Sequence, residues 1–287
     1  MINSFRPRMA HGIQTRTSSL GLIILLCLLF GSAHLSAAPE ADLWSFWDKA
    51  DEQSTRQVDH GEWSAILERY VSHDDRGNAL VDYAAVNKQD AASLKRYIAS
   101  LAEIDPRTLR KPEQMAYWFN LYNALTVQLV IEAYPVSSIK KVKGGFFNKG
   151  PWDEEVVTIA NEALTLNDIE HRILRPIWQD KRIHYAVNCA SIGCPNLAAN
   201  AYEADKLEQQ LDAAASTFIN QRKGVASLGE GRFELSSIYD WYGEDFGTEA
   251  ELFQHLQAFH KDRLLTDGKA PADIDYNYDW SLNDIGQ

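Results

Sequence analysis

The pattern of apolar and polar positions divides the chain into a first half that favours helices and a second half that favours hairpins. From Leu43 to about Leu101, apolar residues recur at helical spacing, which predicts mainly helical structure. The segment Pro112–Tyr134 is apolar on nearly every side, begins with a proline and is followed by Pro135, so both of its ends carry helix boundary signals. A helix with this pattern is normally buried on all faces. We therefore predict a central buried helix here.

Shorter alternating runs in the second half predict two hairpins. Val156–Ile159 and Leu164–Leu166 flank a polar turn at Asn161 and Glu162, and the runs VASL and RFELS flank a turn at Gly229–Gly231. Alternation bounded by turn residues is the pattern of paired antiparallel strands. The hairpins therefore predict antiparallel pairing in this half.

Two further strands follow from alternation alone. Arg182–Asn188 alternates with its apolar residues on one side, and Tyr276, Tyr278 and Trp280 mark a final strand. Helices are predicted in three other places: residues 169–174 after an Asn167/Glu170 capping box, residues 204–220, and the run IYDWYGEDF opened by Ser237 and Asp240. Together these elements predict the α+β class. The N-terminal helices and the central buried helix would pack on a mostly antiparallel sheet.

The first 38 residues have the three parts of a cleavable secretory signal in order. Three arginines and no acidic residue precede the apolar stretch Leu20–Phe30, and small residues lead to Ala38. The apolar stretch is well short of the roughly twenty residues that cross a bilayer. We therefore predict export to the periplasm or the extracellular space, with no stable membrane insertion after cleavage. The remaining chain divides into a helical region, residues 39–105, and an α+β domain, residues 106–287, which form one unit.

The net negative charge of the chain limits the classes of molecule that it is expected to bind. The chain has 28 basic and 40 acidic residues; removal of the leader takes away three arginines and no acidic residue, which makes the mature chain more acidic still. Because nucleic acids and anionic lipids usually bind a basic face, we predict no nucleic-acid partner. The composition fits a soluble protein with an unidentified peptide or small-molecule ligand. No cofactor is indicated by any motif.

Chemistry-bearing residues are densest in the segment HYAVNCASIGCP, which holds His184, Asn188, Cys189 and Cys194. One interpretation is a nucleophilic cysteine, in which a thiolate attacks an acyl carbon and a histidine carries protons. Cys189 would be the nucleophile and His184 the base. In a fully extended strand the two side chains would lie about 16 Å apart on opposite faces, so this pair needs a sharp turn at Asn188.

A second interpretation of the same segment is a structural disulfide between Cys189 and Cys194. Four residues separate the cysteines and the intervening loop contains Gly193, so closure is sterically feasible, and export would favour it. The two interpretations overlap if the bridge is redox-active. A zinc site is disfavoured because Cys-x4-Cys lacks a second close pair of ligands, and we predict no metal.

Polar residues inside the central helix are the other candidates. Asn120 and Asn123 lie three apart in an otherwise apolar helix, and buried asparagine is costly without hydrogen bonds. They either pin the helix to a loop or line a pocket that faces His184. Glu113 and Tyr117 fall on the same helix stripe as Asn120 and would form the polar wall of that pocket. The helix is not expected to span a membrane, because it is interrupted by Asn120, Asn123, Gln128 and Glu132.

Five segments of the chain resemble one family. They are WFNLYNALTVQLV (Trp118–Val130), LTLNDIEHRILRP (Leu164–Pro176), HYAVNCASIGCP (His184–Pro195), IYDWYGEDF (Ile238–Phe246) and YDWSLND (Tyr278–Asp284). They are similar to the bacterial and plant family called domain of unknown function 547 (DUF547), for which no reaction is settled. The resemblance implies intracellular plant members with a similar cysteine segment, in which the thiols stay reduced.

The order of a buried helix followed by antiparallel strands is also similar to the papain and transglutaminase-like superfamily, where the nucleophilic cysteine starts the central helix. Here that helix offers Asn120 or Asn123 and no cysteine. The analogy concerns the fold and carries little weight for function.

These observations lead to one hypothesis and a rival. The hypothesis is a cysteine-dependent hydrolase or acyl transferase, with Cys189 as nucleophile, His184 as general base and Asn120 as an orienting or oxyanion group; Asn123, Asn188 and Cys194 complete the site. The rival is a non-catalytic binding or scaffold module of the envelope, with a disulfide-stapled loop. A carboxylate-based hydrolase is a third option.

Overall fold

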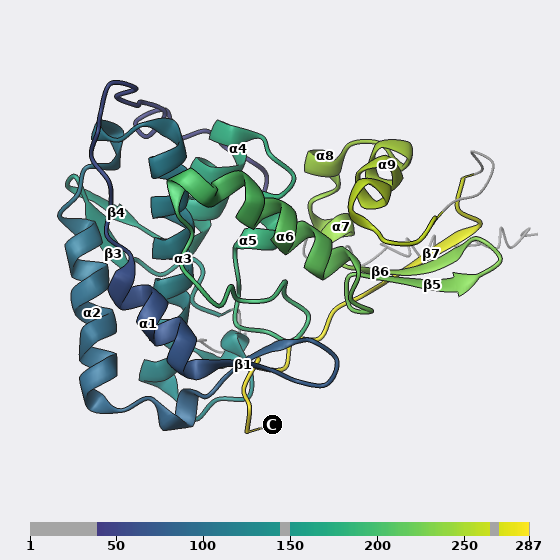
Figure 1. Cartoon of the computed structure of the whole chain (residues 1–287), viewed down its shortest axis with the longest axis horizontal. Coiled ribbons are helices and arrows are strands. Elements are labelled where there is room, and N and C mark those ends of the chain that lie inside the picture. Colours follow the sequence, from purple (N-terminus) through teal and green to yellow (C-terminus); the bar gives the residue numbers. More distant parts are fainter. Residues whose placement is uncertain (1–38, 144–149, 265–269, 287) are drawn as a thin grey trace, which may run out of the picture. The chain divides into compact units, whose positions relative to one another are not determined.

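The structure is a computed structural model that describes residues 39–143, 150–264 and 270–286 (Figure 1). The predicted signal peptide lies outside the described residues. Residues Ala37–Gln287 form one compact unit. No helix in the described ranges is both long enough and apolar enough to cross a membrane.

The described residues form helices and small, mostly antiparallel sheets, which confirms the α+β class. The longer elements are α1 (Gly61–Tyr70), β1 (Val71–His73), β2 (Ala79–Val81), α2 (Lys88–Ala102), α3 (Lys111–Ala133), β3 (Val157–Ile159), β4 (Glu162–Leu164), the π-helical η4 (Asp168–Leu174), α4 (Arg175–Trp178), α5 (Ile183–Ala186), α6 (Leu207–Ile219), β5 (Val225–Gly229), β6 (Arg232–Ser236), α7 (Ile238–Trp241), α8 (Gly243–Phe246), α9 (Glu249–Phe259) and β7 (Asp273–Asn277). Short 3₁₀ turns are η1 (Tyr83–Ala85), η2 (Pro106–Thr108), η3 (Ile139–Lys141) and η5 (Ala204–Lys206).

The central helix α3 matches the prediction closely. It is buried along almost its whole length, including its polar residues Glu113, Asn120 and Asn123. The helix packs against α2, η4 and η5, and its apolar side chains form the middle of the larger of two hydrophobic cores. Because residues 113–127 are buried on every side, the pattern that is apolar all round is the one this position requires.

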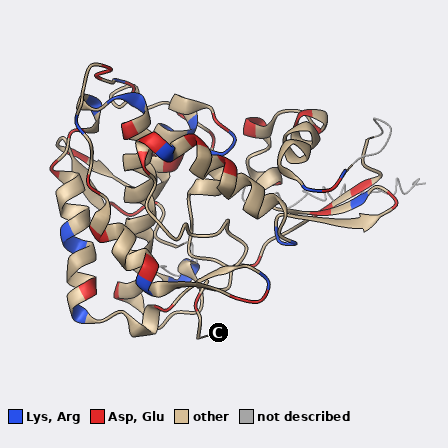
Figure 2. Cartoon of the chain, in the orientation of Figure 1, with Lys and Arg blue, Asp and Glu red and all other residues tan. Residues whose placement is uncertain are grey.

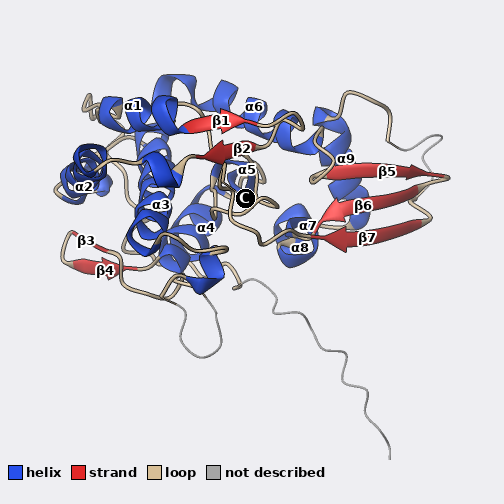
Figure 3. Cartoon of the chain, turned by 90° about the horizontal axis from the view of Figure 1, so that it is seen from below, coloured by secondary structure: helices blue, strands red, loops and turns tan. Residues whose placement is uncertain are grey.

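The strands in the described part of the chain form three small sheets (Figure 3). The predicted hairpins are β3–β4 and β5–β6, both antiparallel. The first turns at Ala160 and Asn161, which both have positive φ, one residue before the predicted turn. The last strand, β7, pairs in parallel with β6 and ends at Asn277, so Tyr278 and Trp280 lie beyond it.

The prediction of a strand over Arg182–Asn188 is wrong. Ile183–Ala186 form the helical turn α5, and every residue from Ile183 to Asn188 is buried, so the alternation in this segment does not separate a core face from a solvent face. Ile183 and Ala186 join the larger core, whereas Tyr185 joins the smaller core around α6, β6 and α9. A short helical turn is what allows neighbouring side chains to enter two cores.

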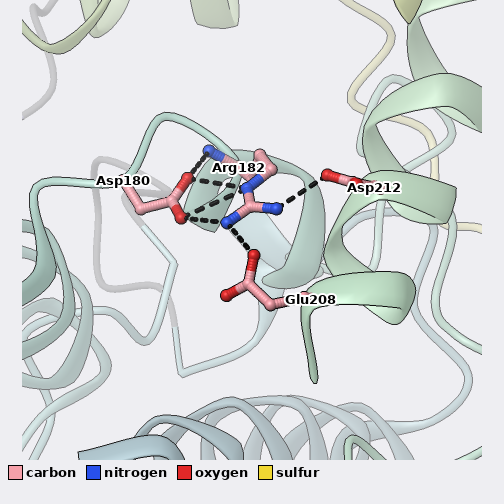
Figure 4. Close-up of polar contacts among 4 residues, drawn as sticks. All are labelled: Asp180, Arg182, Glu208 and Asp212. Atoms are coloured by element: carbon pink, nitrogen blue, oxygen red, sulfur yellow. Dashed lines mark hydrogen bonds and ion pairs between the residues drawn. The ribbon is translucent and has the colours of Figure 1, made fainter. Parts of the chain in front are cut away.

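An arginine holds α5 in place. Arg182 bonds the carboxylate of Asp180 and reaches Asp212 and Glu208 on α6, with N–O distances of 2.7 and 2.8 Å (Figure 4). The Asp180 carboxylate also accepts the backbone N–H of Arg182. Side-chain bonds to the local backbone compete with a strand ladder, which explains why this segment turns.

Two local predictions also need correction. The helix at residues 168–174 begins with a reciprocal pair of bonds between Thr165 and Asp168, and Asn167 makes no capping bond. The N-terminal region contains the hairpin β1–β2 where helix was predicted. Its turn is closed by the Asp74 carboxylate, which accepts the N–H groups of Arg76 and Asn78, a side-chain-made turn of the Asx type.

Candidate functional site: the Cys189–Cys194 loop

Asparagines fix the loop that carries the two cysteines. Asn123 on α3 donates to Ala186 O and accepts the N–H of Asn188, at 2.9 and 2.8 Å. Asn188 then closes the loop, because it donates to Pro195 O and accepts the N–H of Ala190. Ala190 has a left-handed φ of 56°, an uncommon conformation for a residue with a Cβ. The loop is therefore tied to a buried helix at its start and closed by Asn188 at its end.

The C-terminal tail runs along the other side of the loop. Ile192 N donates to Ser281 O and Gly193 N donates to Asp279 O, both at 2.8 Å. A Cβ at Gly193 would lie 2.7 Å from the backbone N of Asp279, so only glycine permits this close approach. The approach places Tyr278 beside the cysteines.

Both cysteines are free, so the predicted bridge is not formed in this structure. Their sulfur atoms lie 2.9 Å apart, and Cys194 Sγ also accepts the N–H of Cys189 at 2.9 Å. Cys189 Sγ contacts Ser191 Oγ at 3.1 Å and Tyr278 OH at 3.0 Å. Cys189 is partly exposed and Cys194 is buried. The two thiols thus form a contacting pair with one accessible member.

The environments of the two thiols move their pKa values in opposite directions. Hydrogen bonding from Cys194, Ser191 and Tyr278 lowers the pKa of Cys189 below its ordinary value. Burial, followed by the interaction with Cys189, raises the pKa of Cys194 well above its ordinary value. The thiolate is the nucleophilic form of cysteine. Cys189 is therefore the more reactive thiol of the pair.

Two lysines flank the loop. Lys223 Nζ donates to Ile192 O and Asn196 Oδ1, and burial lowers its pKa to about 8. Lys140 lies with its Nζ 3.7 Å from the ring centre of Trp280; burial lowers its pKa while the nearby Cys189 raises it. Trp280 packs against Tyr278 and Trp241 at centroid distances of 4.6 and 5.5 Å. The accessible thiol therefore has an aromatic and cationic border.

His184 belongs to a different cluster. Its Nε2 bonds Asp245 Oδ2 at 2.7 Å, and its Nδ1 is buried without a hydrogen-bond partner. Arg175, which is 3% exposed, bonds both oxygens of Asp245 and also contacts His171 Nδ1. The pKa of Asp245 is strongly lowered, because His184 and Arg175 stabilise its charge by more than burial opposes it. We call these four residues the imidazole–carboxylate cluster.

No hydrogen bond between His184 and Cys189 occurs among the described residues. The ring of Tyr242 stacks on His184 at a centroid distance of 4.2 Å. Burial raises the pKa of Tyr242 well above its ordinary value, and the charges of Glu170 and Cys189 raise it further. Tyr242 thus packs on the imidazole–carboxylate cluster. The predicted Cys189–His184 dyad stays a prediction.

The other predicted site residues lie elsewhere on α3. Asn120 uses both polar atoms on the backbone of Tyr202, and Tyr117 donates to Leu101 O. Glu113 accepts the N–H of Val58 and lines a separate pocket with His60. None of the three makes a hydrogen bond to the cysteine loop. Their spacing in the sequence predicted that Glu113, Tyr117 and Asn120 share one face of the helix. In the structure a different neighbouring segment covers each of the three.

Several residues of the site were missed by sequence reasoning. Tyr278 and Lys223 contact the cysteine loop, Ser191 within the loop contacts Cys189, and Asp245 pairs with His184. Tyr278 belongs to the tail motif YDWSLND and Asp245 to the motif IYDWYGEDF. The motifs therefore pointed to these segments, but they did not indicate that Tyr278 contacts Cys189 or that Asp245 contacts His184. Within the described ranges, no group of three or more His, Cys, Asp or Glu residues is arranged to hold a metal ion.

The comparisons with known proteins agree with the motif evidence. The family model described as "Protein of unknown function, DUF547" matches residues 106–219. This segment belongs to the DUF547 family. The match contains α3, the cysteine loop and α6, while Asp245 and Tyr278 lie outside it. No curated protein and no solved structure matches the chain. The relation to papain-like proteins stays a prediction.

Proposed function

We propose that the DUF547 domain is a thiol-dependent catalyst in which Cys189 and Cys194 carry out thiol–disulfide exchange. The observation that carries this proposal is the contact between a partly exposed thiol and a buried thiol, with sulfur atoms 2.9 Å apart. A lowered pKa on the accessible cysteine and a raised pKa on the buried one give the division between attacking and resolving thiols that exchange requires.

The reaction is a transfer of two electrons. The Cys189 thiolate attacks one sulfur of a substrate disulfide, a mixed disulfide forms, and the first substrate thiolate leaves and takes up a proton. Cys194 then loses its proton and attacks Cys189 Sγ, so that an internal disulfide forms and the second substrate thiolate leaves. The substrate is reduced and the cysteine pair is oxidised. A partner dithiol returns the pair to the reduced state.

Export fits this proposal. If the leader directs the chain out of the cytoplasm, the domain works in a compartment where disulfides form and persist. N-terminal sequencing and fractionation of the expressed protein test this step separately. A mature N-terminus near Pro39 in the exported fraction supports it, and an intact leader in the cytosolic fraction contradicts it.

The test of exchange counts thiols with 5,5′-dithiobis(2-nitrobenzoate) in a Cys27→Ser background. The parent protein is expected to release two thionitrobenzoate ions per chain, the second by attack of Cys194. Cys194→Ser is expected to release one and keep the other as a mixed disulfide, which mass spectrometry detects. Cys189→Ser is expected to react at least about 100-fold more slowly, because the remaining thiol is buried. Equal reaction of both cysteine variants would contradict the proposal.

Acyl transfer at Cys189 is the second candidate, favoured by the bonded pair of His184 and Asp245. Such a pair orients an imidazole in nucleophilic enzymes. The imidazole would have to come within about 3 Å of Cys189 during the reaction. An acylating thiol probe separates the candidates. Acylation that needs His184 and persists in Cys194→Ser favours acyl transfer, whereas exchange needs Cys194 and is indifferent to His184→Ala. The binding-module alternative predicts that Cys189→Ser changes no activity.

A further inference from the structure

Lys223 bridges the two sides of Cys194 in the cysteine loop. Its Nζ donates to the carbonyl oxygen of Ile192 at 3.1 Å and to Oδ1 of Asn196 at 2.9 Å. One of these acceptors lies before Cys194 in the chain and the other lies after it. An ammonium group has three N–H donors, so these two bonds leave one donor of Lys223 unused. The positive charge is therefore fixed on the segment that carries the buried thiol.

The turn that follows α6 positions this lysine. Gly224 N donates to Gln221 O at 2.9 Å, and a Cβ at Gly224 would clash with the backbone at the end of α6, so this return of the chain requires glycine. The Gln221 side chain donates to Gly77 O in the turn between β1 and β2, and Asn196 donates to the same oxygen at 2.7 Å. The β1–β2 hairpin, the turn after α6 and the cysteine loop thus hold one another in place around Lys223.

No carboxylate compensates the charge of Lys223. Basic and acidic residues are interspersed over the fold (Figure 2), and Arg182 is paired with three carboxylates. Lys223, by contrast, makes no ion pair within the described ranges, and its two acceptors are neutral oxygens. Burial lowers its pKa to about 8, whereas the charges of Cys194, Asp74 and Cys189 raise it. A partly desolvated ammonium group with neutral partners attracts a negative charge that forms nearby.

Cys194 is the residue of the pair whose negative charge needs such support. It is buried, and burial, followed by the interaction with Cys189, raises the pKa of its thiol well above the ordinary value. In the exchange reaction Cys194 has to become a thiolate before it can attack. Ionisation of a buried thiol is costly unless a nearby cation stabilises the charge. Lys223 is a cation bonded to the backbone of this segment.

We propose that Lys223 is a positioning residue for the second step of exchange, in which its ammonium group stabilises the thiolate that forms on Cys194. The inference rests on the exchange reaction proposed above. In this step the proton of Cys194 passes to water and a bond forms between the sulfur atoms of Cys194 and Cys189. The bond between Cys189 and the substrate breaks, and the substrate thiolate leaves with the electron pair. The DUF547 match ends at residue 219, so it does not include this lysine.

The second release of thionitrobenzoate from 5,5′-dithiobis(2-nitrobenzoate) tests the inference in the Cys27→Ser background. Lys223→Gln keeps a hydrogen-bond donor but no charge. It is expected to slow the second release by about tenfold or more at about pH 7, the equivalent of one hydrogen bond to a charged group. The first release, by Cys189, is expected to change less. Lys223→Arg keeps a positive charge and is expected to restore the fast second release.

The neighbouring Arg222 offers a matched control. It is exposed, and Arg222→Gln changes the net charge of the chain by the same amount as Lys223→Gln. This variant is expected to match the parent protein in both releases. Denaturant unfolding of all three variants checks that each one is folded.

The pH profile of the second release separates a charge effect from a structural one. The titratable groups that act on Lys223 are Asp74 in the β1–β2 turn and the two thiols, while Cys189 and Tyr278 act on Cys194. Lys223 is charged below its pKa of about 8. The advantage of the parent protein over Lys223→Gln is therefore expected to shrink as the pH rises above this value. Loss of loop structure alone would slow the second release by the same factor at every pH.

The results that would overturn the inference are distinct from those that contradict exchange. A second release in Lys223→Gln as fast as in the parent, equal slowing of both releases, the same slowing at every pH, or no recovery in Lys223→Arg would overturn the role of Lys223 alone. A parent protein that releases only one thionitrobenzoate ion would contradict the exchange reaction and, with it, this role.

Discussion

The cysteine loop and the imidazole–carboxylate cluster use the side chains expected of a catalytic triad, yet they differ in what they leave available. In the loop, Cys189 is partly exposed and its neighbours lower its pKa. In the cluster, Asp245 is bonded by both Arg175 and His184, and His184 is buried. A buried group held in an ion pair stabilises a fold, whereas a group with a stabilised charge and an accessible face can react.

The comparison shows why residue types alone do not define a site. His184 and Cys189 are five positions apart, but α5 directs the imidazole towards Asp245 on α8 while Cys189 contacts Tyr278 from the tail. Each partner comes from a segment distant in sequence. Reactivity depends on these long-range contacts, because they set exposure and pKa.

The largest loss of stability is expected when the imidazole–carboxylate cluster loses the negative charge of Asp245. Asp245→Asn leaves the buried guanidinium of Arg175 without its ion-pair partner, and unpairing a buried charge costs roughly 3–5 kcal/mol. Denaturant unfolding measures the loss. The control Asp212→Asn removes an exposed partner of Arg182, which keeps Asp180, and is expected to change stability by less than about 0.5 kcal/mol. Similar losses in both variants would mean that the cluster is not a stabilising core.

The same carboxylate predicts a dependence of stability on pH. The folded-state pKa of Asp245 is depressed, so its contribution is fully present above the unfolded value of about 3.9 and is lost as the pH falls through the folded pKa. The unfolding free energy is therefore expected to decrease below about pH 4. Asp245→Asn is expected to reduce this dependence, while carboxylates such as Asp168 and Asp180, whose pKa values are also lowered, retain the rest. If the unfolding free energy of the variant fell with pH as steeply as that of the wild type in this range, the loss of stability in acid would come from other groups.

An intermediate effect is expected at the attachment of the cysteine loop. Asn123→Ala removes the bonds to Ala186 O and Asn188 N and leaves both backbone groups buried, at a cost of about 1–3 kcal/mol. It is also expected to slow closure of the internal disulfide, as seen in the second release of thionitrobenzoate. Gln128→Ala, on the exposed part of the same helix, serves as the control. Unchanged closure would show that the loop does not need this anchor.

The smallest effect is expected at Tyr278. Tyr278→Phe removes the hydroxyl that contacts Cys189 Sγ and helps to lower the pKa of this thiol, so the pKa of Cys189 is expected to rise. The pH dependence of alkylation by iodoacetamide reports this value. Tyr276→Phe, an exposed position on β7, is expected to leave it unchanged. A pKa that does not move in Tyr278→Phe would remove the tail from the site.

The local pattern of apolar and polar residues was sufficient to predict several of the helices and hairpins. The helix α3, the helix α6 and the hairpins β3–β4 and β5–β6 follow from periodicity and turn residues. The DUF547 segment was recognised from its motifs. The strand predicted at Arg182–Asn188 failed because this segment enters two cores and is buried on both sides, so its alternation carried no information about a solvent face.

The sequence by itself determined the class of fold, the central helix and the short segment that holds both thiols. Those features depend on interactions between residues near one another in the chain. Only the tertiary structure decided that Cys189 meets Tyr278, that His184 meets Asp245 and that Glu113 lines a pocket with His60. Contacts across tens or hundreds of residues are set by how the cores pack, and local periodicity does not encode them.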